Sequence, residues 1–290
     1  MNKKDDFYQN AFSKHFGLIS AKEQEKLKNS KVAIAGLGGV GGIYLLNLVR
    51  TGIGNFHIAD FDIFETSNIN RQIGANIHSL GRPKIEVMEE MAKSINPYIY
   101  VKSFKEGINN ENLDEFLKGV NVVLDGLDFF NIKDRLFLFK KARERNIYVI
   151  TSPPIGFGAS LLAFSPKGMN FEEYFDIKEG MSEKEMLLSF GLGLSPSLLH
   201  RKYFKPSLIN FAEQKGPSLT IGILSCANLG ICEAVKIILN KKINPAPFST
   251  QFDPFIQKYK KVYLRKGNKS WKQLLKKWFI KRKLKKLGNL

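Results

Sequence analysis

Residues 31–60 read KVAIAGLGGVGGIYLLNLVRTGIGNFHIAD, and they decide the expected fold. A short apolar strand is predicted over 31–36, and it runs directly into a cluster of glycines. An apolar helix is predicted over 43–52, where Gly52 ends it, and a second strand over 55–60 finishes in an acid. This order of strand, glycine turn, helix and strand is typical of parallel strands joined by right-handed crossovers.

The same alternation of strands and helices continues to about residue 155. Further strands are predicted over 98–104, 120–128 and 147–154, and helices over 21–30, 83–96, 110–119 and 131–146. The run at 120–128 is almost continuously apolar before its acids, as in a central parallel strand buried on both faces. The sequence therefore predicts an α/β fold with a doubly wound, Rossmann-like, mostly parallel sheet and helices on both faces.

The pattern loosens after residue 155. Three more elements are predicted there: a strand pair at 156–168, a long helix at 218–239, and antiparallel strands at 248–267 that extend the sheet at its C-terminal end. Residues 170–216 are rich in Phe, Gly, Ser and Pro with weak periodicity, so 155–215 is interpreted as a substrate-facing excursion or a loop. We expect one main domain over 1–263 and a basic tail over 264–290.

The composition is that of a globular protein with room for a sizeable core: 290 residues, 43% hydrophobic and 25% charged. No run of 18 uncharged apolar residues occurs and the N-terminus lacks the apolar stretch of a secretory signal, so a cytoplasmic protein without a transmembrane helix is expected. Cys226 and Cys232 are expected to be small core residues of one helix. With the four histidines they form no zinc-ligand spacing, so no structural zinc is predicted.

The glycine cluster predicts a nucleotide site. Its glycines allow a tight turn and a close approach to a phosphate, and they are Gly36, Gly38, Gly39 and Gly41. The helix that follows directs free N–H groups to the same place, and Asp60 ends the next strand where an acid can bond a ribose hydroxyl. The alternative is that the glycines serve only close helix–sheet packing. Such loops bind NAD, FAD or ATP, so the loop alone does not choose the nucleotide.

Residues 59–84, ADFDIFETSNINRQIGANIHSLGRPK, carry more polar and basic groups than a ribose contact needs. Their D-x-D, S-N-x-x-R-Q and G-x-P-K motifs follow the glycine loop and precede VVLDGLD at 122–128. This combination resembles the ThiF/MoeB/HesA-type adenylating enzymes, which are relatives of the ubiquitin-activating enzymes. The resemblance covers about residues 20–165 and, more faintly, 216–239.

The resemblance implies an ATP- and Mg²⁺-dependent adenylyltransferase that activates a carboxylate and releases pyrophosphate, and it implies a homodimer. Positioned cations suit this chemistry because negative charge spreads over phosphate oxygens in the transition state. The implied roles are the ribose contact for Asp60, phosphate contacts for Arg71 and Lys84, polar support from Asn68 and Gln72, and the Mg²⁺ ligand for Asp128. The implied acceptor is a ubiquitin-like or sulfur-carrier protein, a peptide, or an RNA-borne carboxylate.

Each of these roles has a simpler alternative. Arg71 and Lys84 are otherwise solvated surface charges, and Asp128 otherwise caps the helix that starts near Asn131. Asp125 has a lesser claim to a role, because it is expected to face elsewhere. His57 and His78 have no matching partners, and we expect them to be structural or surface residues.

The chain departs from the family's pattern in four ways. The family's two zinc-binding C-x-x-C pairs are missing, and residues 151–225 contain no cysteine, which favours direct attack on an acyl-adenylate over thioester transfer. Phe129 and Lys133 stand where the family usually has an asparagine and an arginine. No arginine precedes Arg50, and Lys14 is the nearest substitute for one that crosses the dimer interface.

The net charge of +18 is concentrated at the C-terminus, because residues 264–290 hold 11 Lys or Arg and no acid, which leaves 18 − 11 = +7 for the rest. One helical face of this tail collects its apolar residues at Trp271, Leu274, Leu275, Trp278 and Phe279. Three interpretations stay open: contact with an anionic membrane surface, which would make the protein peripheral; contact with RNA; or a solvated helix packed onto the body by its tryptophans.

Two other functions remain as alternatives. An NAD(P)-dependent oxidoreductase would explain the glycine loop and Asp60, but it gives no reason for the motifs at 68–84. A non-catalytic nucleotide-binding scaffold would fit Phe129 and the missing early arginine.

Overall fold

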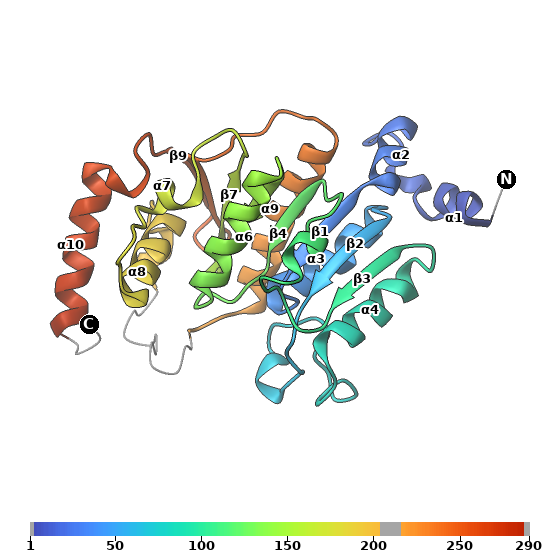
Figure 1. Cartoon of the computed structure of the whole chain (residues 1–290), viewed down its shortest axis with the longest axis horizontal. Helices are drawn as coiled ribbons and strands as arrows, with labels where there is room; N and C mark the ends of the chain where they lie inside the picture. The colour runs from blue at the N-terminus through green and yellow to red at the C-terminus, as the bar shows by residue number, and fades with distance from the viewer. Residues whose placement is uncertain (1–2, 204–215, 287–290) are drawn as a thin grey trace.

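The computed structural model describes residues 3–203 and 216–286, with the backbone alone described over 283–286. Within these residues a sheet of nine strands forms the middle of the molecule, in the order β3-β2-β1-β4-β5-β7-β8-β9, with β6 paired to β7 (Figure 1). The strands are β1 (Lys31–Ala35), β2 (Asn55–Ala59), β3 (Tyr100–Phe104), β4 (Val122–Asp125), β5 (Tyr148–Thr151), β6 (Pro154–Ile155), β7 (Gly158–Phe164), β8 (Phe248–Asp253) and β9 (Lys258–Tyr263).

Strands β1 to β5 pair in parallel, and β7, β8 and β9 continue the sheet in antiparallel pairing. The predicted doubly wound, mostly parallel sheet with a C-terminal antiparallel extension is confirmed. The order β3-β2-β1-β4-β5 reverses direction between β1 and β4, where the carboxyl ends of both strands form the crevice in which such sheets bind ligands.

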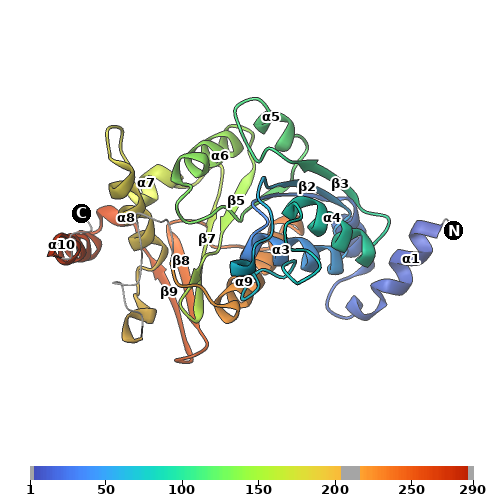
Figure 2. The same ribbon diagram turned by 90° about the horizontal axis from the view of Figure 1, so that it is seen from below.

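Helices cover both faces of the sheet (Figure 2). They are α1 (Lys3–Ala11), α2 (Ala21–Asn29), α3 (Gly39–Arg50), α4 (Lys84–Ile95), α5 (Leu113–Phe116), α6 (Ile132–Glu144), α7 (Phe171–Phe175), α8 (Glu183–Leu194), α9 (Thr220–Ile238) and α10 (Trp271–Lys286). One core cluster joins the sheet to α3, α4 and α9, and the other joins it to α5, α6, α7 and α8.

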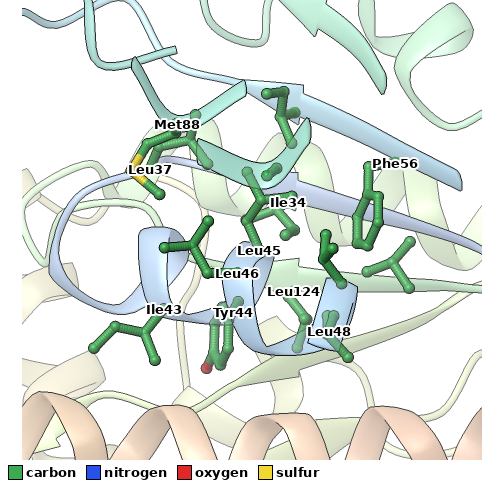
Figure 3. Close-up of a cluster of buried hydrophobic side chains, with 14 of the residues drawn as sticks. Ile34, Leu37, Ile43, Tyr44, Leu45, Leu46, Leu48, Phe56, Met88 and Leu124 are labelled. Carbon is green, nitrogen blue, oxygen red and sulfur yellow. The ribbon is translucent and has the colours of Figure 1, made fainter. Parts of the chain in front are cut away.

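Strand β1 shows why an apolar run without alternation forms a central strand. Val32 and Ile34 belong to the first core cluster, while Ala33 and Ala35 belong to the second, so both faces are buried. On the first face, Ile34 and its neighbours in β2 and β4 pack against Tyr44 and other side chains of α3 (Figure 3). This packing fixes α3, and with it the loop that precedes α3.

Helix α9 is long and apolar enough to cross a membrane by length and composition alone. It packs against α3 and β7 as a core helix, and its apolar residues Ile223 and Ala227 are buried there. Of the two cysteines expected in this core, Cys226 is buried but Cys232 is exposed, so the expectation for Cys232 is wrong. Cys232 lies six residues after Cys226, on a different side of the helix from it.

The region with weak periodicity differs from its prediction. Residues 158–164 form one strand, whose hairpin partner is the short β6 rather than a second strand within 156–168. Residues 171–175 and 183–194 form helices α7 and α8 instead of an irregular excursion. Helix α8 was missed because it is apolar on most sides and holds Gly191 and Gly193, which disfavour helix in isolation; Ser182 nevertheless caps its start in a capping box.

Candidate active site

The turn between β1 and α3 requires glycine at two positions. Gly36 has a φ of +87°, and a Cβ placed there would lie 2.4 Å from the carbonyl oxygen of Gly126 at the end of β4. A Cβ on Gly41 would lie 1.8 Å from the carbonyl oxygen of Gly36. Close packing of the helix on the sheet therefore explains why glycine is needed at positions 36 and 41.

The start of α3 has features that packing does not explain. Gly38 is its N-cap and provides no side-chain cap, so the first N–H groups of the helix remain available to an anion. A Cβ on Gly38 would lie 3.8 Å from Nε2 of Gln72, and one on Gly39 would lie 3.6 Å from the carbonyl oxygen of Arg71. The segment around Arg71 and Gln72 therefore lies directly against this helix N-terminus.

Asp60 braces the glycine loop. Its Oδ2 accepts a hydrogen bond from the Leu37 N–H at 2.6 Å, and its Oδ1 accepts one from the Asp62 N–H at 2.8 Å. Burial raises the pKa of the Asp60 carboxyl, while the two backbone hydrogen bonds act in the opposite direction. The carboxylate thus holds the loop in place, and its remaining lone pairs are compatible with a ribose hydroxyl.

Lys84 is not a solvated surface charge. Its side chain is 7% exposed, and Nζ lies 2.8 Å from Oδ2 of Asp62, whose own side chain is about half exposed. The backbone N–H of Lys84 also donates to the carbonyl oxygen of Asp62 at 2.9 Å. As the first residue of α4, Lys84 is held beside the strand end that carries Asp60.

Asn68 and Gln72 are both buried in the turn that begins at η2 (Thr66–Asn68). The Oδ1 of Asn68 accepts from the N–H of Glu65 at 3.0 Å, so this side chain shapes the turn. The Oε1 of Gln72 is buried without a hydrogen-bond partner. This acceptor lies next to the N-terminus of α3, where it can accept a hydrogen bond from a donor group of a ligand, such as a hydroxyl or an amino group.

Arg71 is partly exposed and lies in the same turn. Its Nη1 donates to the carbonyl oxygen of Ser67 and to Oδ1 of Asn70, both at 2.9 Å. These contacts hold the guanidinium close to the turn that contacts α3.

Asp128 lies just beyond β4 and is exposed. Its Oδ1 accepts from the N–H of Phe130 at 3.0 Å, whereas α6 begins after Asn131, so Asp128 is not the N-cap of that helix. Gly126, two residues earlier, contacts the glycine loop. Asp128 is therefore connected to the glycine loop through the backbone of residues 126–128.

The residue that sequence reasoning missed is Arg135. Its Nε lies 2.7 Å from Oδ2 of Asp125, and both side chains are almost fully buried. Its Nη2 donates to the carbonyl oxygens of Leu127 and Asp128, so Arg135 fixes the backbone that carries Asp128. Lys133, which was expected in place of the family's arginine, is an exposed residue paired with Glu183 at 3.2 Å.

A signal for Arg135 was present in the sequence. The expected asparagine and arginine positions, 129 and 133, are four residues apart, and so are Asn131 and Arg135. Phe129 itself packs against Phe190 of α8, with ring centroids 5.5 Å apart.

The residues fit the groups that the resemblance implies. The glycine loop at an uncapped helix N-terminus and the buried lysine suit the phosphates of a nucleotide triphosphate, and the unpartnered acceptor of Gln72 suits a hydroxyl or amino donor of the nucleoside. Among residues 3–203 and 216–282, no three or more His, Cys, Asp or Glu side chains gather into a group that could hold a metal. Mg²⁺ bound with nucleotide phosphates needs only one or two carboxylates, so Asp128 is sufficient in number.

Comparison with known proteins gives one family and several relatives. A model described as the ThiF family matches residues 12–272. The chain is 34% identical over 142 residues to the tRNA threonylcarbamoyladenosine dehydratase of Bacillus subtilis, covering 49% of this chain and 55% of that protein. It is 32% identical over 148 residues to the sulfur carrier protein ThiS adenylyltransferase of Escherichia coli, covering 51% and 58% respectively.

The matched part spans little more than half the length of these curated relatives. Among solved structures, PaaA superposes with a TM-score of 0.66 at 20% identity, covering 91% of this chain and 74% of that one. E. coli MccB with ATP superposes with a TM-score of 0.61 at 20% identity, covering 91% and 72%. At these identities the structural matches establish the shared fold.

Proposed function

Because the chain belongs to the ThiF family, we propose that it is an ATP-dependent adenylyltransferase. It activates a carboxylate as an acyl-adenylate and releases pyrophosphate. The supporting observation is that the Arg71–Gln72 segment lies against the N-terminus of α3, with the buried Lys84 nearby in the chain. An oxidoreductase would use the glycine loop but has no need of this cationic segment.

In this proposal, ATP would supply the electrophilic α-phosphate and a pyrophosphate leaving group. The N–H groups of α3 and the cations of Arg71 and Lys84 bind and orient the phosphates, where they stabilise developing charge. Asp60 holds the ribose, Asn68 and Gln72 support the nucleotide, and Asp128 would hold Mg²⁺. The glycines that shape the cradle are Gly36, Gly38, Gly39 and Gly41.

The acceptor belongs to one of three classes: a small carrier protein, a peptide, or a carboxylate on RNA. Relatives whose names specify sulfur-carrier adenylylation and tRNA dehydration, and MccB structures with MccA, support these classes. Attack by a separate nucleophile directly on the acyl carbon of the acyl-adenylate, with AMP as the leaving group, is favoured over a thioester on Cys226, because that thiol is buried and burial raises its pKa.

We further propose that residues 1–263 carry the site and that 264–290 form a distinct basic tail. We propose that the protein acts in the cytoplasm as a homodimer, in which the exposed Lys14 of one copy faces the nucleotide of the other. Phe16 and Leu18, which are 51% and 91% exposed, lie beside Lys14 and would be covered by such an interface.

Pyrophosphate exchange into ATP, measured with a panel of carrier proteins, peptides and carboxylated RNA, tests the activity. We expect exchange with one class, and a loss of about 10²–10³-fold for Lys84→Met or Arg71→Met, the usual cost of one electrostatic contact to a transition state. Lys93→Met on the same helix α4, where Lys93 is an exposed partner of Glu89, is the control and should keep full exchange.

Two results would favour the alternatives. Selective NADH binding over ATP in a thermal-shift titration would support the oxidoreductase. ATP binding that persists while Asp128→Ala leaves the biological activity intact would support a non-catalytic scaffold.

A further inference from the structure

Helix α10 packs on the body through its polar side. Gln273 is 1% exposed, and its Nε2 donates to the carbonyl oxygen of Leu192 at the end of α8. Three lysines of α10 also turn inward: Lys276 donates to the carbonyl oxygen of Pro196 at 2.5 Å, Lys277 to Oγ of Ser189 at 2.6 Å, and Lys281 to Oε1 of Glu185 at 2.9 Å. Burial lowers the pKa of both Lys276 and Lys277.

The opposite side of α10 is apolar and faces solvent. Its large side chains are about half exposed or more: Trp271 70%, Leu274 46%, Leu275 49%, Trp278 52% and Phe279 58%. They follow the i, i+3, i+4, i+7, i+8 spacing of one helical face. The interpretation in which the tryptophans pack onto the body is therefore wrong, and the helix lies with its polarity reversed relative to an ordinary surface helix.

Positive charge surrounds this apolar face. The Nζ of Lys272 lies 5.4 Å from the ring centroid of Trp271, and the guanidinium of Arg282 lies 5.5 Å from that of Trp278. Residues 254–282 contain 11 Lys or Arg and no Asp or Glu. A partner that fits this surface has an apolar layer for the exposed side chains and negative charge in front of that layer for the basic groups.

We propose that α10 binds the surface of an anionic lipid bilayer. Trp271, Leu274, Leu275, Trp278 and Phe279 enter the boundary between headgroups and acyl chains, while Lys272 and Arg282 contact lipid phosphates. Figures 1 and 2 both show α10 at one end of the molecule, with α8 between it and the sheet. A bilayer held at that end leaves the β1–α3 loop, farther along the molecule, accessible to substrates.

RNA and a second copy of the chain fit the same surface less well. RNA would use the outward basic groups Lys272 and Arg282, but it offers no apolar layer to the exposed Leu274 and Leu275. A second α10 would bring two strongly basic surfaces together without acids to offset them.

The chain offers a direct readout, because Trp271 and Trp278 are its only tryptophans. The full-length protein is titrated with vesicles of phosphatidylcholine alone and with vesicles containing phosphatidylglycerol, while tryptophan emission is followed. We expect a blue shift with anionic vesicles, weakened by salt, and little or none with phosphatidylcholine.

A double variant tests the apolar contact while keeping both tryptophans. Leu274→Ser with Leu275→Ser alters only half-exposed side chains, so the fold should persist, and vesicle affinity should fall at least about tenfold from the lost apolar area. The control is Tyr100→Ser, since Tyr100 is 52% exposed on β3, a different part of the chain, and this change should leave vesicle binding unchanged.

Three outcomes would overturn the proposal. The first is no blue shift with anionic vesicles, or an equal shift with phosphatidylcholine alone. The second is tight binding of a structured RNA in preference to anionic vesicles. The third is a concentration-dependent blue shift without lipid, which would identify a second copy as the occupant.

Discussion

Arg135 and Lys133 lie two residues apart on α6 and differ in their surroundings. The Arg135 guanidinium is buried against Asp125 and lies 4.6 Å from the ring centroid of Phe190, whereas the pair of Lys133 with Glu183 is exposed. Removing one partner of a buried pair leaves an uncompensated charge, but removing one partner of an exposed pair costs little.

Arg135→Leu should therefore lower the free energy of unfolding by about 3–5 kcal/mol. Lys133→Leu, the matched control, should change it by no more than about 1 kcal/mol. Urea unfolding followed by circular dichroism measures both. Similar small changes for the two variants would show that the buried pair does not stabilise the end of β4.

Gln72 and Gln24 allow binding to be separated from stability, because both are 7% exposed. The Oε1 of Gln72 has no partner, whereas Gln24 donates to the carbonyl oxygen of Thr51 at 3.3 Å and its Oε1 lies 2.9 Å from Nδ1 of His15. Replacing an unpartnered buried group costs no hydrogen bond, whereas breaking partnered ones leaves buried groups unsatisfied.

Gln72→Met should keep or raise the free energy of unfolding and weaken ATP binding. Gln24→Met should lower the free energy of unfolding by about 1–3 kcal/mol and leave ATP binding unchanged. Chemical denaturation and calorimetric titration of each variant provide the comparison. If Gln72→Met binds ATP as the native chain does, Gln72 has no part in the nucleotide site.

At the scale of elements, His57 joins β2 to α5. It is 2% exposed, and its Nδ1 donates to the carbonyl oxygen of Phe116 at 2.8 Å, so this nitrogen carries the proton in the neutral ring. Burial lowers its pKa below the ordinary value of about 6.5. As the pH falls, the imidazole is therefore protonated at a higher pH in the unfolded chain than in the folded chain, which favours unfolding.

The contribution of His57 to stability should thus be complete above about pH 6.5 and be lost as the pH falls through its lowered folded-state pKa. His57→Gln should flatten the fall in unfolding free energy measured from pH 7.5 to 5. Burial lowers the pKa of His200 in the same direction, so His200→Gln should remove a separate part of the slope. An unchanged slope in both variants would contradict this origin of acid sensitivity.

The elements that could be predicted are those whose burial is regular. Strands β1 and β4 and helices α3 and α4 follow from apolar runs and spacings that the core uses directly. The orientation of α10 could not be predicted, because its pattern favours an inward apolar face. In the structure the inward side of α10 instead makes hydrogen bonds from Gln273, Lys276 and Lys277 to α8 and the chain after it.

The same limit applies to the site. The position of the glycine loop between β1 and α3, and of Asp60 after β2, could be predicted, because a turn with these steric demands leaves a local signature. The role of Arg135 could not be predicted, because it depends on a buried partner ten residues away, Asp125. The contact between Phe129 and Phe190 of α8 joins residues far apart in the sequence, so the local pattern of apolar residues does not predict it.

At the scale of the whole molecule, the sheet brings the nucleotide cradle to the crevice between β1 and β4, while α10 lies at the far end of its antiparallel extension (Figure 1). The proposed carboxylate activation and the proposed membrane contact thus belong to separate regions of the molecule. A variant of α10 should not alter ATP binding, and a variant of the cradle should not alter vesicle binding.

Calorimetric titration of the full chain with ATP and Mg²⁺, alongside NADH, tests the central claim most directly. We predict saturable ATP binding, no comparable NADH binding, and weaker ATP binding for Lys84→Met but not for Lys93→Met. Failure of the native chain to bind ATP, or selective binding of NADH, would contradict the assignment of this site to adenylyl transfer.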